Sequence, residues 1–315
     1  MIEKIERWAN FLNKTQTRWR RIGYLVSASA MVYLVALLVY SGIQIRSIEI
    51  SGYWIPILAT MVLYLLSLVT QVVVWIRLLS FHHKGGWQDV IIYARTIIMR
   101  RLPGGVWHWL GRSTMYAGNT KVAGRVIVGA NFIEWLMLIL VAGSLAIIGV
   151  RELPWFARVL GAILVGSAGV GLAFKWQPQS RNWILRLFEG LAWIGLYGIA
   201  WFLGGAIVYA LVQATGGERL SLVQAVWVWA VAGGSSLLLI IVPAGLGIRE
   251  LTITWLLTPY LPASAAILVA ILIRFSFTLA DVIWGSLGWG IGHLIVRNDP
   301  EAQESSVISQ TDQQL

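Results

Sequence analysis

Long apolar runs separated by short polar connections dominate the sequence. A helix needs about 20 apolar residues to cross the hydrocarbon core of a bilayer, and several runs reach that length. They cover Ile22 to Ser41, Trp54 to Leu79, Val126 to Val150, Trp155 to Phe174, Leu187 to Val212, Leu220 to Val242 and Ala263 to Val296. The pattern predicts an all-α polytopic integral membrane protein with about 6–8 transmembrane helices.

Two apolar stretches are interrupted by proline and glycine. The first has Pro103, Gly104 and Gly105 at its centre, and the second has Pro243, Gly245 and Gly247. Proline removes a backbone donor and breaks a helix. Broken backbone at membrane depth is tolerated only where protein or water surrounds it. We therefore interpret the two stretches as halves of one site.

Each interrupted stretch allows two structures. Trp87 to Arg125 either lies on the inner interface as an amphipathic helix or forms a re-entrant hairpin that starts and ends in the cytoplasm. The hairpin is favoured because the apolar residues around its tip are compact and have arginines on both sides. Leu220 to Leu257 is either a second hairpin entered from outside, or Leu220 to Val242 crosses fully. Ile248 to Leu257 is only about 15 Å of helix in either case.

The spacing of two charges indicates an inverted repeat. Glu134 lies 31 residues after Pro103, and Arg274 lies 31 residues after Pro243. Three predicted crossings separate the interrupted stretches, and an odd number inverts one half relative to the other. Paired Pro/Gly-interrupted segments in inverted halves are the best sequence pointer to the midplane site of a transporter.

Composition excludes a soluble domain. Hydrophobic residues make up 58% of the 315 residues and charged residues 12%, whereas a soluble surface needs about a quarter charged residues. We divide the chain into a basic cytoplasmic segment (1–21), a transmembrane domain (22–296) and a disordered cytoplasmic tail (297–315). The basic residues before the first span place the N-terminus in the cytoplasm, and we expect a plasma membrane.

Charge and residue types narrow the chemistry. In a membrane protein the net charge of +10 indicates cytoplasmic loops and anionic lipid rather than nucleic acid. The absence of Cys excludes disulfides, Cys-ligated zinc and thiol catalysis. Isolated His and dispersed carboxylates give no nucleophile–base or metal set, so we expect no cofactor and no catalytic residue. The 18 Trp are assigned mainly to interfacial belts.

The interrupted stretches favour an anionic ligand. A helix that begins inside the membrane directs free N–H groups and its positive dipole end into the site, and arginine offers forked donors suited to phosphate. The predicted lipid-binding or phosphate-binding residues are Arg100, Arg101, Pro103, Gly104, Gly105, Arg112, Glu134, Pro243, Gly245, Gly247, Arg249, Glu250 and Arg274.

Two arginine assignments remain open. Arg100 and Arg101 either belong to the site or extend to the interface as snorkelling side chains. Arg249 and Glu250 are adjacent on one helix, a poor geometry for pairing, so we expect each to have a partner elsewhere.

These motifs resemble the lysylphosphatidylglycerol synthase transmembrane region, also called the flippase-like domain family. The resemblance covers about Ile22 to Val296 and is carried most strongly by Pro243 to Glu250 with Arg274 downstream. Ala244 stands where the family usually has Gly, and Trp135 where a basic residue is common. The resemblance implies a helical bundle with re-entrant elements that binds and translocates lipids. No soluble aminoacyl-transferase domain fits in the chain, so lysyl transfer is not implied.

We therefore expect a stand-alone lipid translocator, in a prokaryotic plasma membrane, for a phospholipid or polyprenyl-phosphate-linked lipid. Its expected partners are an anionic or phosphate-bearing lipid, an envelope-biosynthesis protein and a second copy of the chain. The alternatives are a membrane partner subunit of a glycosyltransferase or other envelope enzyme, and a membrane enzyme that acts on lipid-linked substrates.

Overall fold

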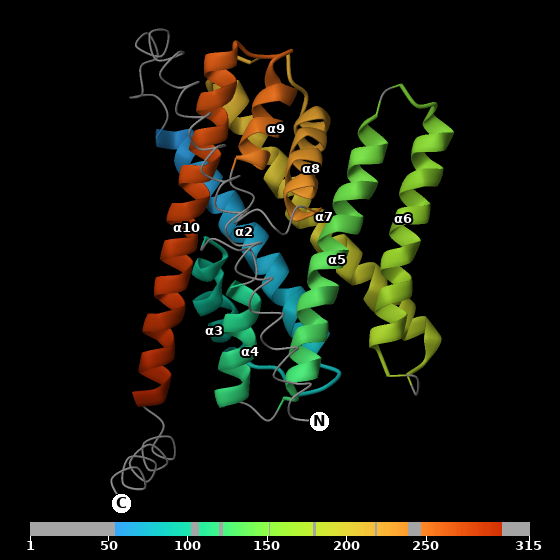
Figure 1. Ribbon diagram of the computed structural model, residues 1–315, viewed down its shortest axis with the longest axis vertical. Helices are drawn as coiled ribbons and strands as arrows, with labels where there is room; N and C mark the ends of the chain where they lie inside the picture. The colour runs from blue at the N-terminus through green and yellow to red at the C-terminus, as the bar shows by residue number, and fades with distance from the viewer. Residues whose placement is uncertain are drawn as a thin grey trace, which may run out of the picture.

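The computed structural model describes residues 54–101, 107–119, 122–150, 152–178, 181–217, 219–238 and 247–297 (Figure 1). For residues 101, 119 and 292–297 it describes the backbone alone. In these ranges 87% of the residues are helical and none is in a strand. The predicted first span, Ile22 to Ser41, and the two terminal segments lie outside the described residues, as do Pro103, Gly104, Gly105, Pro243 and Gly245.

Within the described ranges, five helices are long and apolar enough to cross a membrane. They are α2 (Trp54–Leu79), α5 (Gly124–Gly149), α6 (Trp155–Trp176), α7 (Trp183–Ala214) and α10 (Ala263–Arg297). Apolar side chains cover their outer faces, and in the most apolar stretch of α6 only 11% of the residues are buried. The chain is thus an all-α protein whose helices suit a multi-pass membrane protein, and the predicted spans within the described ranges coincide with helices to within a few residues.

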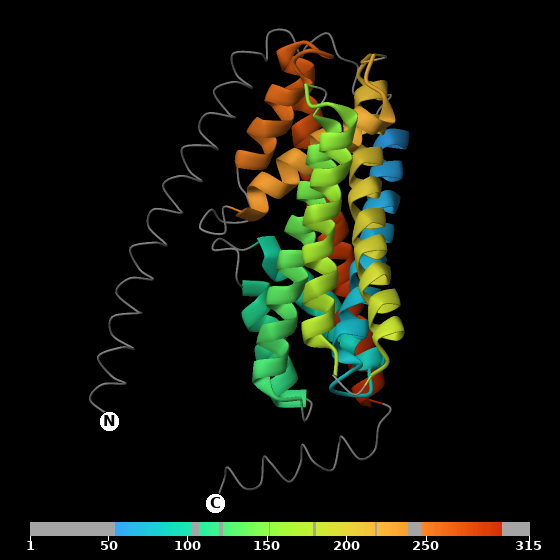
Figure 2. The same ribbon diagram turned by 90° about the vertical axis from the view of Figure 1, so that its right-hand side faces the viewer.

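Shorter helices form two hairpins between the long ones. The first consists of α3 (Trp87–Ile97), the 3-10 turn η2 (Ile98–Arg101) and α4 (Trp107–Asn119), and the second of α8 (Leu222–Leu238) and α9 (Ile248–Leu257). The first occupies the lower half of the molecule as drawn, and the second occupies the upper half (Figures 1 and 2). The inner ends of both hairpins therefore approach the middle of the long helices.

The two hairpins have corresponding neighbours. In each case the order along the chain is long helix, hairpin, long helix: α2 and α5 flank the first hairpin, and α7 and α10 flank the second. α2 runs downward where α7 runs upward, and α5 runs upward where α10 runs downward (Figure 1). α3 packs on α10, α8 packs on α5, and α2 packs along α7. The contacts are those of two interlocked units with opposite orientation.

Candidate functional site

A cavity of about 210 Å³ lies between the two hairpins and the long helices. Its described lining comes from α2, η2, α4, α5, α7, α8, α9 and α10. Three of the predicted charged residues line it: Arg100 from the first hairpin, Glu134 from α5 and Arg249 from the second hairpin. The structure thus brings charges from both interrupted stretches to one space.

Arg112 and Glu134 form a buried ion pair between α4 and α5. The Arg112 guanidinium donates to Glu134 Oε2 and, at 3.2 Å, to Asn131 Oδ1, and it is fully buried. Its carbon Cζ lies over the Tyr93 ring at 3.9 Å and over the Trp75 ring at 4.4 Å. These rings offset part of the cost of burying the charge. Arg112 therefore neutralises Glu134 and holds it in position. Glu134 is among the described residues that line the cavity, whereas Arg112 is not.

Arg100 turns inward from the end of η2. Its guanidinium donates to Gln71 Oε1 and to the Tyr93 hydroxyl, both at 3.4 Å. The same Tyr93 hydroxyl donates to Glu134 Oε1 at 2.8 Å. These contacts direct the Arg100 side chain into the cavity, among residues of α2, α3 and α5. The side chain of Arg101 lies outside the described part.

Glu250 and Arg274 form the corresponding ion pair between α9 and α10. Arg274 donates to Glu250 Oε1 at 2.7 Å, and Glu250 is 2% exposed. The predicted partner elsewhere thus exists for Glu250. Arg249 also approaches Glu250 Oε1, at 3.5 Å, a longer distance than that of the Arg274 contact. Arg249 lies between two rings, 5.6 Å from Trp229 and 5.7 Å from Phe277.

Gly247 begins α9 with φ 86°, in the left-handed region that favours glycine. Its N–H donates to Glu250 Oε2 at 2.9 Å. The carboxylate therefore caps the helix and pairs with Arg274 at the same time. This N–H is already occupied, so at the described residues the cavity's positive charge comes from the arginines and not from this amide.

The two ion pairs have opposite polarity. The returning helix of the first hairpin supplies the cation, Arg112, and the long helix that follows supplies the anion, Glu134. In the second hairpin the returning helix supplies the anion, Glu250, and the long helix the cation, Arg274. Each hairpin is thereby tied to the long helix that comes next in the chain.

A further polar chain fixes the base of the first hairpin. Asp89 accepts from the Gly86 N–H at 3.0 Å and from the Tyr116 hydroxyl at 2.7 Å, and it contacts His83 Nε2 at 3.0 Å. The Trp75 indole N–H donates to Tyr116 at 2.9 Å. Because the Trp75 ring also packs on the Arg112 guanidinium, these hydrogen bonds link Asp89, at the start of α3, to the ion pair between Arg112 and Glu134.

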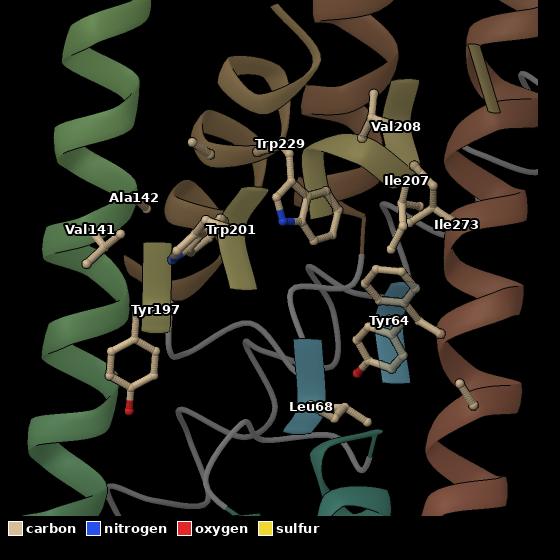
Figure 3. Packing of buried hydrophobic residues seen from close by; sticks show 14 of the residues in the cluster. Tyr64, Leu68, Val141, Ala142, Tyr197, Trp201, Ile207, Val208, Trp229 and Ile273 are labelled. Atoms are coloured by element: carbon tan, nitrogen blue, oxygen red, sulfur yellow. The ribbon is translucent and has the colours of Figure 1, made fainter. Parts of the chain in front are cut away.

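Several residues at the cavity were not predicted. Gln71 could have been predicted from the sequence, because it is a polar residue inside an apolar span and such residues usually face the bundle interior. His108 of α4 also lines the cavity. Trp201 and Trp229 also line it (Figure 3). These two tryptophans, Trp75 and Trp193 are buried, so the interfacial belt does not account for these four.

Among the described residues, no three His, Cys, Asp or Glu side chains lie close enough together to hold a metal ion. Comparison with known proteins finds no matching family model and no similar curated protein.

Proposed function

We propose that the chain binds a phosphate-bearing lipid in the cavity and moves its headgroup between the leaflets of a prokaryotic plasma membrane. The observation that carries the proposal is the convergence of Arg100 and Arg249, from opposite hairpins, on one cavity that Glu134 also lines. Arginine binds phosphate with forked, charge-assisted hydrogen bonds. Sites of this kind, between two Pro/Gly-interrupted segments, are typical of secondary transporters.

The balance of buried charge supports a ligand with a single negative charge. The described charged side chains at or next to the cavity are Arg100, Arg112, Arg249, Arg274, Glu134, Glu250 and Asp281. Four cations against three carboxylates leave an excess of one positive charge. A phosphodiester carries one negative charge and neutralises that excess, and buried charge is costly unless it is neutralised.

The arrangement supports an inverted repeat with two re-entrant hairpins. About 17 residues of α8 and 10 of α9 give roughly 26 Å and 15 Å of helix, less than the roughly 30 Å of a hydrocarbon core. Basic residues gather at the lower end of the molecule, so we place that end in the cytoplasm. They are Arg77, Lys84, Arg125, Lys175, Arg181 and Arg186. The first hairpin then enters from the cytoplasm and the second from outside, and the flippase-like family that the sequence resembles also has re-entrant elements.

The test is leaflet exchange in proteoliposomes that contain a headgroup-labelled phospholipid. We expect the wild type to accelerate exchange, and Arg249→Ala and Glu134→Gln to reduce it at least about tenfold, a loss of roughly 1.4 kcal/mol of ligand or transition-state binding. Arg77→Ala is the matched control, because Arg77 lies at the lower end with a side chain 45% exposed, paired with Glu189. It should exchange lipid at the wild-type rate.

Two outcomes would contradict the proposal. Exchange by the wild type at the rate of protein-free liposomes would exclude translocation of the lipids tested. Wild-type exchange by both site variants, with folding verified by size-exclusion chromatography, would remove the cavity from the mechanism.

A further inference from the structure

Two indoles form a wall of the cavity. Trp201 comes from α7 and Trp229 from α8, and their ring centroids lie 6.3 Å apart at an angle of 54°. Both line the cavity and are less than a tenth exposed. Figure 3 shows them side by side, with α5 on one side and α10 on the other. They present aromatic surface to whatever occupies the cavity.

Glycines opposite each indole make this wall possible. A methyl group at Gly204 of α7 would overlap the indole of Trp229, and a methyl group at Gly233 of α8 would overlap the indole of Trp201. Each helix thus provides a recess for the tryptophan of the other. The recesses hold both rings in place at the cavity, which fits a surface shaped for a ligand.

Three polar atoms of cavity-lining residues have no hydrogen-bond partner among the residues that the structure describes. They are the indole nitrogen Nε1 of Trp201, Nδ1 of His108 and Nε of Arg100, and all three residues line the cavity. Trp201 is 6% exposed, so water does not reach its N–H freely. Leaving a buried donor unsatisfied costs free energy. A ligand hydroxyl that reaches one of these atoms satisfies it.

The ring faces do not suit a cationic headgroup. The guanidinium of Arg249 already lies within 6 Å of the Trp229 and Phe277 rings, and Arg100 adds a second positive charge. Glu134 is the one carboxylate among the described lining residues, and Arg112 and Tyr93 already bind it. An amine headgroup would therefore meet repulsion and find no free carboxylate in this lining.

Resting on the proposed function, we propose that the lipid carries a cyclic polyol, such as a hexose or inositol, on its phosphodiester. The C–H face of such a ring is weakly positive and stacks on the negative face of an indole. Its hydroxyl groups accept from the Trp201 N–H and pair with His108, Ser67 and Ser236, which line the cavity. The phosphodiester pairs with Arg100 and Arg249.

The test compares headgroups, with the same acyl chains in the three glycerophospholipids. Purified protein in detergent is titrated with phosphatidylinositol, phosphatidylglycerol and phosphatidylethanolamine, and with a polyprenyl-phosphohexose, and thermal stabilisation gives an apparent Kd for each. We expect the wild type to bind at least one cyclic-polyol lipid about tenfold more tightly than phosphatidylglycerol or phosphatidylethanolamine. If phosphatidylinositol binds more tightly, the lipid has a glycerol backbone; if the polyprenyl-phosphohexose binds more tightly, it has a polyprenyl chain.

Two variants probe the wall. Trp201→Phe removes the N–H and reduces the ring, and Gly233→Ala displaces the Trp201 indole. Both should lower the preference for the cyclic polyol to about that of phosphatidylglycerol while phosphodiester binding remains. Gly198→Ala on α7 is the matched control, because a methyl group there meets nothing within 4 Å, and it should keep the preference.

The outcomes separate this inference from the proposed function. Equal binding of all phosphodiester lipids, or an unchanged preference in Trp201→Phe, would overturn the cyclic-polyol assignment and leave lipid binding intact. Absence of binding by every lipid would overturn the phosphate site itself. If Gly233→Ala does not fold, Trp201→Phe alone decides the assignment.

Discussion

The ion pair between Arg112 and Glu134 gives the sharpest prediction about stability. Glu134→Gln removes one charge and leaves the fully buried Arg112 without its carboxylate. Two nitrogens of Arg112, Nε and NH2, already have no hydrogen-bond partner in the described part of the chain, so little remains to compensate. The remaining support is Asn131 and the rings of Tyr93 and Trp75. Removing one partner of a buried pair costs about 3–5 kcal/mol.

That cost should disappear when both charges are removed. Replacing a buried pair by apolar residues of similar volume is often neutral. The Tyr93 hydroxyl, which donates to Glu134, also lies 3.5 Å from Gln71 Oε1 and keeps an acceptor. We therefore expect Arg112→Met/Glu134→Leu to lie within about 1 kcal/mol of the wild type.

The measurement is unfolding in mixed micelles, followed by tryptophan fluorescence as denaturant is added. Glu134→Gln should also lower Tm by roughly 6–10 °C, taking about 2 °C per kcal/mol for a chain of this size. Arg77→Met breaks a half-exposed pair with Glu189 and should cost less than about 1 kcal/mol. Equal losses in the single and the double variant would refute the reasoning, because they would show that the two charges are not coupled.

Two further changes test the hairpins. Gly247→Ala should destabilise the protein by about 1–2 kcal/mol, because φ 86° is strained for a residue that has a side chain. Gly86→Ala is the control, because Gly86 has an extended φ of −166° and open space around it. Equal Tm values in the two variants would contradict this prediction. Trp135→Phe removes the 3.1 Å hydrogen bond from the indole N–H of α5 to the Leu237 carbonyl at the end of α8. It should cost about 1 kcal/mol and raise amide hydrogen exchange in α8, and unchanged exchange would show that this contact does not hold the hairpin.

Hydrophobic patterning was sufficient for the long helices. The predicted span Trp54 to Leu79 has the bounds of α2, and the predicted short segment Ile248 to Leu257 has those of α9. Apolar runs bounded by charges or proline leave little freedom in where such helices end. α7 begins before the predicted Leu187, at Trp183, because Asn182 caps it by accepting from the Ile184 N–H at 2.9 Å.

The partners of the site residues could not be predicted from the sequence. Glu250 and Arg274 lie 24 residues apart, and only the angle between α9 and α10 decides whether their side chains meet. Trp201 has the same sequence environment as a lipid-facing tryptophan. Its burial depends on Gly233 in another helix, and one sequence contains no information on that pairing.

The packing between the two units indicates where movement can occur. Within each unit a buried ion pair fixes the hairpin to the long helix that follows it, and separating that pair is costly. Between the units, small residues make two of the close contacts: Gly234 of α8 faces Ala142 of α5, and Gly288 of α10 faces Ala94 of α3. Larger side chains also join the units, among them Trp135 of α5, which donates to the Leu237 carbonyl of α8. Small residues let membrane helices approach closely without interlocking large side chains. If the chain moves lipid as proposed, we expect each hairpin to move together with the long helix that follows it, because its buried ion pair is costly to separate.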